Sequence, residues 1–214
     1  MVLLSHAPTL AGPPASAKGP SGRWGRHTRD RPRVCTRGAP VRGCDTERVI
    51  LRPSTPADDP LILAWNAADV HVLSPMDAAR LAYLRQRARA VEIVEVDGRP
   101  AGFVVTFTEG ADYDSANYTW FSARESAFHY VDRIVIDLRH RGRGLARSVY
   151  ASLAARFPDR PLLAEVSYAP PNPTSLTFHE RFGFTQVGRL GDGSSGVVLL
   201  KLSPHNTLSA DTVR

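Results

Sequence analysis

Apolar and polar positions alternate along the chain in two kinds of segment, and their order predicts an α/β fold. Short β-branched or alternating segments indicate strands at 49–53, 91–96, 101–107, 131–136, 162–166, 184–189 and 197–202. Apolar residues at three- and four-residue spacing indicate helices at 58–68, 75–87, 145–157 and 172–182. This order predicts a mixed central sheet of about seven strands with about four helices.

Two connections carry signals of their own. Asp97-Gly98 lies between two predicted strands and is a typical hairpin turn. Residues 109–124 are rich in acidic and aromatic side chains, and we expect them to form a loop.

The most informative stretch is Val131–Phe157, which predicts a strand, a glycine-bearing turn and an amphipathic helix in succession. The first turn of a helix leaves backbone N–H groups unpaired, and the helix dipole adds partial positive charge there. Glycine at positions 142 and 144 would let a phosphate approach the backbone with no Cβ in the way. The stretch therefore predicts an anion site at the start of the helix.

Two common phosphate-binding motifs do not fit. The dinucleotide-binding motif requires a third glycine where this chain has Arg147, and no acidic residue clearly ends a second strand farther on. The P-loop pattern of glycine, four residues, glycine, lysine and serine or threonine is absent from the sequence.

Arg139-x-x-Gly142-x-Gly144 after a strand resembles the acetyl-CoA signature of the GNAT acetyltransferases. Alone, this pattern is also compatible with a glycine turn beside a solvated basic edge.

A second motif lies downstream. Asn172 is a good N-cap, Pro173 suits the first helical turn and Gly183 suits the helix end. The segment resembles the fourth-helix motif of the same family, in the family's order and spacing. The resemblance covers residues 48–202 and is greatest to bacterial members with a similar YVDRI strand and PPNP run.

The resemblance implies the GNAT fold, with strands four and five splayed apart and the pantetheine arm of acetyl-CoA between them. Ile134 and Ile136 would then pair with the pantetheine, and the amides of 141–145 would bind the pyrophosphate. The full set of cofactor-binding residues implied in this way is Ile134, Val135, Ile136, Arg139, Arg141, Gly142, Arg143, Gly144, Leu145, Asn172, Ser175 and Phe178. No metal is expected.

The implied reaction transfers an acetyl group from acetyl-CoA to a primary amine of a small molecule or peptide, by direct attack in a ternary complex. An alkylamine is neutral in only about 1 part in 10³ at pH 7, so deprotonation is worth about 4 kcal/mol. Asp132 and Glu165 are the candidate bases, although each is equally compatible with a structural ion pair.

The family commonly uses a tyrosine in the fourth helix to protonate the leaving thiolate, and this chain has His179 at that position. A histidine can donate a proton near neutral pH, but it can equally be a polar residue lining the site. Tyr168 and Tyr130 are alternatives, whereas Tyr150 is expected to pack in the core.

The acceptor is less defined. Acidic and aromatic residues of 109–124 suit an ammonium ion, or equally a loop that packs on the sheet. Peptide N-termini, lysines, polyamines, small amines and aminoglycosides all remain candidates. The alternative from another class is a non-catalytic acyl-CoA sensor or interaction protein of the same fold.

Charge is concentrated at one end of the chain. Residues 1–44 contain eight Lys or Arg and one Asp, a net +7 against +6 for the whole chain, so the remainder carries −1. This segment also contains six prolines and six glycines, a composition typical of disorder. We expect a disordered tail at 1–45, an acetyltransferase domain at 46–203 and a frayed tail at 204–214.

The tail at 1–45 has three interpretations: an electrostatic contact to nucleic acid or acidic membranes, a targeting peptide, or an inert extension from an upstream start codon.

For the acetyltransferase domain we expect no nucleic-acid partner. The sequence contains no apolar run long enough to span a membrane. Both cysteines, Cys35 and Cys44, lie in the tail, which fits a reducing cytoplasm. A monomer or homodimer is expected.

Overall fold

The computed structural model describes residues 48–204. The predicted disordered tail at 1–45, with both cysteines, lies outside the described residues, as does almost all of the predicted tail at 204–214.

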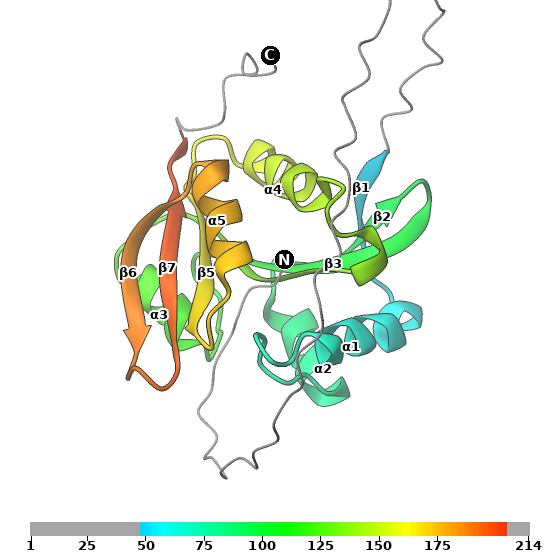
Figure 1. Cartoon of the computed structure of the whole chain (residues 1–214), viewed down its shortest axis with the longest axis horizontal. Coiled ribbons are helices and arrows are strands. Elements are labelled where there is room, and N and C mark those ends of the chain that lie inside the picture. The colour runs from blue at the N-terminus through cyan, green and yellow to red at the C-terminus, as the bar shows by residue number, and fades with distance from the viewer. Residues whose placement is uncertain (1–47, 205–214) are drawn as a thin grey trace, which may run out of the picture. The chain divides into compact units, whose positions relative to one another are not determined.

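Within the described residues the chain forms one seven-stranded sheet in the order β1-β2-β3-β4-β5-β7-β6 (Figure 1). The strands are β1 (Val49–Pro53), β2 (Ala90–Val96), β3 (Arg99–Thr108), β4 (His129–Ile136), β5 (Leu162–Ala169), β6 (Thr185–Gly191) and β7 (Gly196–Leu202). The helices are α1 (Asp59–Ala68), α2 (Ala78–Arg87), α3 (Ala116–Ser122), α4 (Leu145–Arg156) and α5 (Pro173–Phe182), with 3₁₀ turns at Pro56–Asp58 and Leu138–His140. The predicted mixed α/β fold is confirmed.

Two predictions about the helices are wrong: one boundary, and one segment expected to be a loop. α2 begins at Ala78 rather than at residue 75, because extended Asp77 caps it by accepting a hydrogen bond from the amide of Arg80 at 2.7 Å. The segment 109–124 is not entirely a loop, because Ser115 caps the short helix α3. The described residues therefore contain five α-helices, where about four were expected.

The hairpin and the downstream helix follow the sequence closely. Asp97 and Gly98 both have positive φ, at 50° and 75°, as a tight hairpin between β2 and β3 requires. The side chain of Asn172 accepts a hydrogen bond from the amide of Ser175 at 3.2 Å, and Gly183 ends α5 in the left-handed region. These predictions are confirmed.

Helices cover both faces of the sheet. α1, α2 and α3 bury one face, around side chains such as Ile62, Leu84 and Phe121. α4 and α5 bury the other, around Val149, Leu153 and Phe182 (Figure 1). Each face thus removes its apolar side chains from water, which supplies the main driving force for the fold.

β4 and β5 are the only parallel neighbours in the described sheet, and they separate soon after they begin. Their pairing runs from His129–Leu162 to Val131–Ala164 and then stops, while β5 goes on pairing with β7. The remainder of β4 therefore has an edge that faces away from β3 and does not pair with β5. This is the predicted splay.

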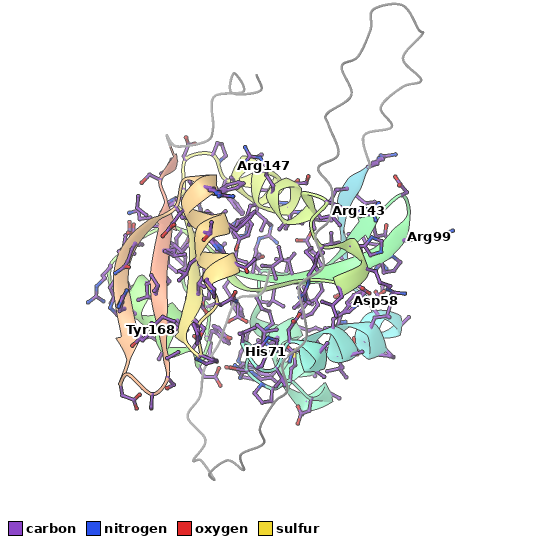
Figure 2. The ribbon with its side chains drawn as sticks, viewed as in Figure 1. Asp58, His71, Arg99, Arg143, Arg147 and Tyr168 are labelled. Atoms are coloured by element: carbon purple, nitrogen blue, oxygen red, sulfur yellow. The ribbon has the colours of Figure 1, made fainter. Side chains whose placement is uncertain are left out.

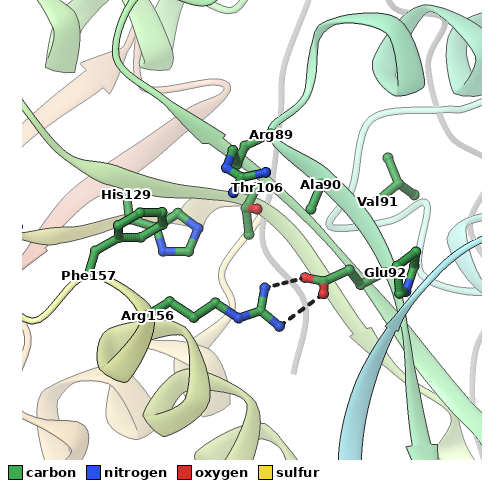
Figure 3. A pocket seen from close by; sticks show the side chains of 9 residues that line it. Arg89, Ala90, Val91, Glu92, Thr106, His129, Arg156 and Phe157 are labelled. Atoms are coloured by element: carbon green, nitrogen blue, oxygen red, sulfur yellow. Dashed lines mark hydrogen bonds and ion pairs between the residues drawn. The ribbon is translucent and has the colours of Figure 1, made fainter.

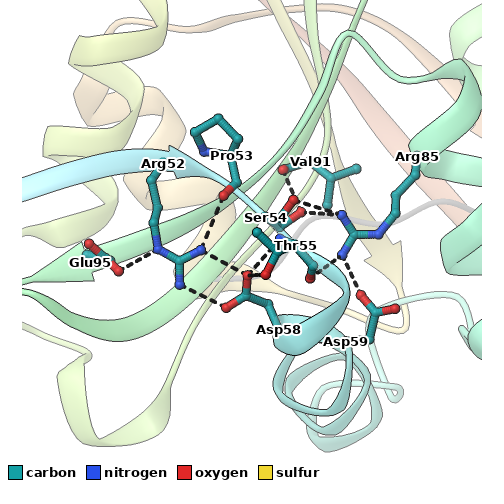
Figure 4. A network of polar contacts seen from close by, with 9 residues as sticks. All are labelled: Arg52, Pro53, Ser54, Thr55, Asp58, Asp59, Arg85, Val91 and Glu95. Atoms are coloured by element: carbon teal, nitrogen blue, oxygen red, sulfur yellow. Dashed lines mark hydrogen bonds and ion pairs between the residues drawn. The ribbon is translucent and has the colours of Figure 1, made fainter.

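A polar network fixes the start of the domain (Figure 4). Arg52 of β1 donates to Glu95 of β2 at 2.6 Å and to both oxygens of Asp58 at 2.8 and 2.9 Å. Arg85 of α2 donates to Asp59 and to the backbone oxygen of Ser54. The network thereby ties β1 to α1, α2 and β2.

No helix among residues 48–204 combines the length and apolar character needed to cross a membrane.

Candidate functional site

The loop between β4 and α4 has the backbone form that the glycines predicted. Gly142 and Gly144 have φ of 77° and 81°, a conformation that L side chains rarely adopt. No heavy atom lies within 4 Å of a Cβ built on either residue, so conformation rather than crowding calls for glycine. Gly144 is the N-cap of α4, whose first amides have no preceding turn to donate to. The loop therefore presents backbone donors and the positive end of a helix dipole.

Two hollows meet at this loop. One has a volume of about 260 Å³, and the other, about 650 Å³, extends from the N-terminal end of α4 along the length of α5. The residues shared by both are Gly144, Arg147, Thr174 and Phe178. Arg147 is exposed on α4 (Figure 2), and Arg181 of α5 lines the larger hollow. The combined groove is therefore basic.

Six of the residues predicted to bind the cofactor line the smaller hollow together. They are Ile136, Arg141, Gly142, Gly144, Leu145 and Phe178. Ile134 is buried in the core on the α4 side of β4, and Val135 points to the opposite core. Only their backbone can face the splay.

The remaining predicted cofactor residues have local partners. Arg139 donates to Asp137 at 2.7 Å, and this holds the pKa of that carboxyl well below its usual range. Arg143 lies at the loop (Figure 2), where its guanidinium is 3.0 Å from Nδ1 of His140. Ser175 is a buried residue of α5, and Asn172 caps that helix. Neither of these two residues lines the hollows.

Arg141 connects the loop to the body of the domain. Its Nε donates to the backbone oxygen of Ile136 at 2.8 Å, and its Nη2 donates to Asp69 at 2.5 Å. These contacts tie the loop to the end of β4 and to the residue that follows α1.

Asp132 and Arg133 lie on the same face of the sheet, which alternation in a strand does not predict. Val105 pairs with Arg133 and Thr106 with Val131, so Asp132 is the extra residue of a β-bulge. Both side chains are fully buried and form an ion pair of 3.0 Å. Asp132 also accepts a hydrogen bond from Tyr113 at 2.6 Å.

Glu165 is the most unusual of the predicted site residues. It lies on β5, one residue after the pairing with β4 ends, and is fully buried. Oε1 accepts hydrogen bonds from Tyr130 at 2.8 Å and Asn117 at 3.2 Å, whereas Oε2 has no partner among the described residues. Burial, and then the negative charge of Asp132, raise the pKa of Glu165 well above its usual range.

His179 is also fully buried, and both of its ring nitrogens are occupied. Nδ1 lies 2.7 Å from the backbone oxygen of Ser175, and Nε2 lies 2.9 Å from the hydroxyl of Tyr150. Burial lowers the pKa of His179 to about 4, so the imidazole is neutral at pH 7.

The acidic and aromatic segment largely packs back onto the sheet. Tyr113 stacks on Phe107 with ring centroids 4.1 Å apart, and the hydroxyl of Tyr118 donates to the backbone oxygen of Thr108. Asp114 pairs with Arg80 of α2 at 2.8 Å. Tyr168, an alternative acid, is half-buried near the end of β5 (Figure 2).

Sequence reasoning missed several residues of the site. Thr174 and Arg147 line the groove, and Tyr150 is the partner of His179. Tyr150 follows the apolar spacing of α4, so the pattern alone indicates a core residue. Arg147 carried a usable signal, because it lies one turn after Gly144 on the predicted anion-binding helix.

A mixed sheet opened between β4 and β5, with a glycine loop and a helix N-terminus beside the opening, is the architecture of an acyl-CoA-dependent transferase. Residues 59–184 match the family model described as Acetyltransferase (GNAT) family. The chain therefore belongs to the GNAT acetyltransferase family and is an N-acetyltransferase with acetyl-CoA as its co-substrate. A comparison with curated proteins gives no match.

Solved structures share the fold at low sequence identity. AAC(6')-Ib, an aminoglycoside acetyltransferase solved with ribostamycin and coenzyme A, is 16% identical with a TM-score of 0.62, over 78% of this chain and 100% of its own. The ribosomal-protein-alanine N-acetyltransferase of Brucella melitensis is 20% identical with a TM-score of 0.53, over 72% and 99%. Naa50 of Arabidopsis thaliana, solved with the bisubstrate analogue CoA-Ac-MVNAL, is 11% identical with a TM-score of 0.53, over 72% and 98%.

Proposed function

We propose that this protein transfers the acetyl group of acetyl-CoA directly to a primary amine of a small molecule or peptide, within a ternary complex. The observation that carries the proposal is the end of β4–β5 pairing at Val131–Ala164, close in the chain to the glycine loop that follows β4. An extended thioester can lie along the unpaired edge of β4 while its phosphates reach the loop.

The groove supports this assignment of the phosphates. Backbone amides at Gly142–Leu145 and the dipole of α4 favour an anion, and Arg147 and Arg181 add two positive charges at its rim. A Cβ at Gly142 or Gly144 would occupy open space that the phosphates would otherwise approach, so these residues fit the co-substrate.

Glu165 is the proposed general base. A carboxyl group with a raised pKa lies closer to neutral pH, where a base and its conjugate acid both exchange protons readily. Its Oε2 has no partner in the described part of the chain, so an amine or one water molecule that reached this buried atom would find an unused acceptor. Asp132, in contrast, is committed to Arg133 and Tyr113, which favours a positioning role.

For His179 we propose a positioning role rather than that of the general acid. Its Nδ1 hydrogen is held by a backbone oxygen and its Nε2 accepts from Tyr150, so neither nitrogen has a proton to give to a thiolate. Its function in this scheme is to fix Tyr150 between α4 and α5.

Small-molecule and peptide amines are both retained as acceptors. The similar structures act on an aminoglycoside in one case and carry a peptide-like bisubstrate analogue in another. The cytoplasm is the proposed location, because the part of the chain expected to fold contains no cysteine.

The direct test is titration calorimetry with acetyl-CoA, followed by thiol release with a panel of amines. Gly142→Val/Gly144→Val should weaken acetyl-CoA binding at least about tenfold, the equivalent of about 1.4 kcal/mol. Gly110→Val is the matched control, since Gly110 also has positive φ, at 80°, with open space around it. Gly110 lies just beyond the end of β3 and lines neither of the two hollows at α4. Tight binding of NAD or ATP without binding of coenzyme A would overturn the proposal.

A non-catalytic acyl-CoA sensor is the second candidate, and the observation that favours it is His179 with both nitrogens occupied. Coenzyme A binding without turnover across a broad amine panel would support the sensor. Thiol release with any amine above the hydrolytic background would exclude it.

A further inference from the structure

A third hollow, of about 530 Å³, lies at the C-terminal end of α4 (Figure 3). Its polar and aromatic lining consists of Arg89, Glu92, Thr106, His129, Arg156 and Phe157. It shares no lining residue with the two hollows at the start of α4. The 12 residues of α4 separate the two regions by about 18 Å, at 1.5 Å per residue.

This hollow contains a buried acceptor without a partner. His129 is 2% exposed, and the backbone oxygen of Leu153 accepts a hydrogen bond from its ring. Nδ1 has no hydrogen-bond partner among the described residues, so the donating nitrogen is Nε2. Burial, with the nearby positive charges of Arg156, Arg89 and Arg160, lowers the pKa of His129 to about 4. At pH 7, Nδ1 is therefore an unused acceptor on a residue that lines the hollow.

Thr106 adds a second unused group. It is fully buried on β3 and lines the same hollow, and its Oγ1 also has no partner in the described part of the chain. A buried hydroxyl or imidazole left without a hydrogen bond costs about 1–3 kcal/mol, so two together at one hollow call for a polar occupant.

The charge of the hollow indicates the sign of that occupant. Glu92 and Arg156 neutralise each other through two hydrogen bonds of 2.7 and 2.9 Å (Figure 3). Arg89 lies beside Thr106 in Figure 3, and its guanidinium has no ion pair or hydrogen bond to another described residue. The lining therefore keeps one uncompensated positive charge, which favours an anion.

The same charge restricts the donor that can reach His129. An ammonium group would approach Nδ1 against the uncompensated positive charge of Arg89, whereas a hydroxyl group would not meet this repulsion. We propose that this hollow is a second binding site, for a small hydroxycarboxylate whose hydroxyl donates to Nδ1 of His129 and whose carboxylate pairs with Arg89. Thr106 donates to the same ligand.

Three isosteric probes test this chemistry: glycolate, which has a hydroxyl group; acetate, which lacks a donor; and glycine, which has an ammonium group. Each is titrated into the full chain saturated with coenzyme A, so that the anion site at α4 is already filled. Backbone amide chemical shifts of the lining residues report binding. Glycolate should give saturable shifts, with acetate and glycine each at least about threefold weaker, in keeping with the loss of one hydrogen bond.

Variants then assign the contacts. Thr106→Val keeps the shape of the side chain and should weaken glycolate binding at least about threefold. Arg89→Met should weaken it about tenfold, because it removes the carboxylate partner. Arg99→Met is the matched control, since it removes an exposed arginine at the β2–β3 hairpin (Figure 2) and should leave binding unchanged.

Any of three results would overturn the proposal. The first is no saturable shift with glycolate up to about 100 mM, far above a millimolar Kd; the hollow then holds water alone. The second is equal affinity for acetate and glycolate in the wild-type protein. The third is equal weakening of glycolate binding by Arg99→Met and Arg89→Met, which would mean that the overall positive charge of the protein, and not Arg89 itself, favours the anion.

Discussion

The hydroxyl of Tyr150 and Nε2 of His179 lie 2.9 Å apart, inside the aromatic cluster between α4 and α5. Because the backbone oxygen of Ser175 can only accept, Nδ1 of His179 carries the proton. Nε2 is then the acceptor, and Tyr150 is the donor. The pair is a closed unit that joins the two helices flanking the proposed acetyl-CoA groove.

This direction of hydrogen bonding predicts unequal effects on stability. Tyr150→Phe should lower the free energy of unfolding by about 1 kcal/mol, because it removes a hydrogen bond and leaves Nε2 unpaired. His179→Phe should cost about 2–3 kcal/mol, because it leaves the Tyr150 hydroxyl unpaired and also places a larger side chain in a packed core. The double variant should be less destabilised than the sum, as urea unfolding in a double-mutant cycle would show.

Kinetics of the same variants test the role of His179. A positioning role predicts a change of about a few-fold, shared between kcat and KM, whereas general acid catalysis is worth about 10²–10⁴-fold. A loss of about 100-fold in kcat, with unchanged acetyl-CoA affinity in His179→Phe, would restore the general-acid role. Recovery of that loss in His179→Tyr would confirm it.

The parts of this protein that sequence predicted well are those with local causes. The strand before Arg139, the two αL glycines and the capped helix after Asn172 are each specified by neighbours in the chain. The bulge at Asp132 is different, because it depends on the register with β3. Strict alternation would have sent Asp132 and Arg133 to opposite faces.

Glu165 illustrates the same limit at the site. Its position on a strand among apolar residues predicted a carboxyl with a raised pKa or an ion pair. The deciding contacts come from Tyr130 and Asn117, which are 35 and 48 residues away. Asn117 lies on α3, a helix that the sequence pattern did not predict.

The two buried carboxyl groups should respond in opposite ways to conversion into amides. Asp132→Asn breaks a buried ion pair and leaves Arg133 uncompensated, so it should lower the free energy of unfolding by about 3–5 kcal/mol. Glu165→Gln removes a group that is costly to ionise when buried, and should leave stability at pH 7 unchanged or higher. If Glu165 is the base, the same change should lower kcat by about 10²–10⁴-fold.

The pH dependence separates a base from a structural group. A pKa raised in the folded state means that the folded chain holds a proton that the unfolded chain releases, so Glu165 makes stability fall as pH rises above about 4.5. This fall in stability with rising pH should be absent from the unfolding curves of Glu165→Gln. The acid limb of the pH profile of kcat/KM should also disappear in that variant. Normal kcat in Glu165→Gln would rule out Glu165 as the base.

The network around Asp58 makes a prediction about stability alone. Asp58 is 6% exposed and accepts from Arg52 twice and from Thr55, so the hydrogen bonds from Arg52 hold the pKa of its carboxyl well below the usual range. Asp58→Asn should lower the free energy of unfolding by about 2 kcal/mol at pH 7. The control is Asp112→Asn, where a 94% exposed side chain pairs with Arg87 at 3.4 Å and should change stability by less than about 0.5 kcal/mol. Equal effects of the two changes would mean that the network contributes no more than an exposed ion pair.

His129 and His179 together predict how stability depends on mildly acidic pH. The folded chain lowers the pKa of each to about 4, against about 6.5 when unfolded, so between these values the unfolded chain binds more protons. Stability from this source is complete above pH 6.5 and is lost as pH falls toward 4. Each histidine should account for about 2 kcal/mol between pH 7 and pH 5. Urea unfolding of the wild type and of His129→Asn at pH 7 and pH 5 isolates the contribution of His129. The free energy of unfolding lost between the two pH values should be about 2 kcal/mol smaller in the variant. An identical loss in both proteins would mean that His129 is protonated in the folded chain at pH 5.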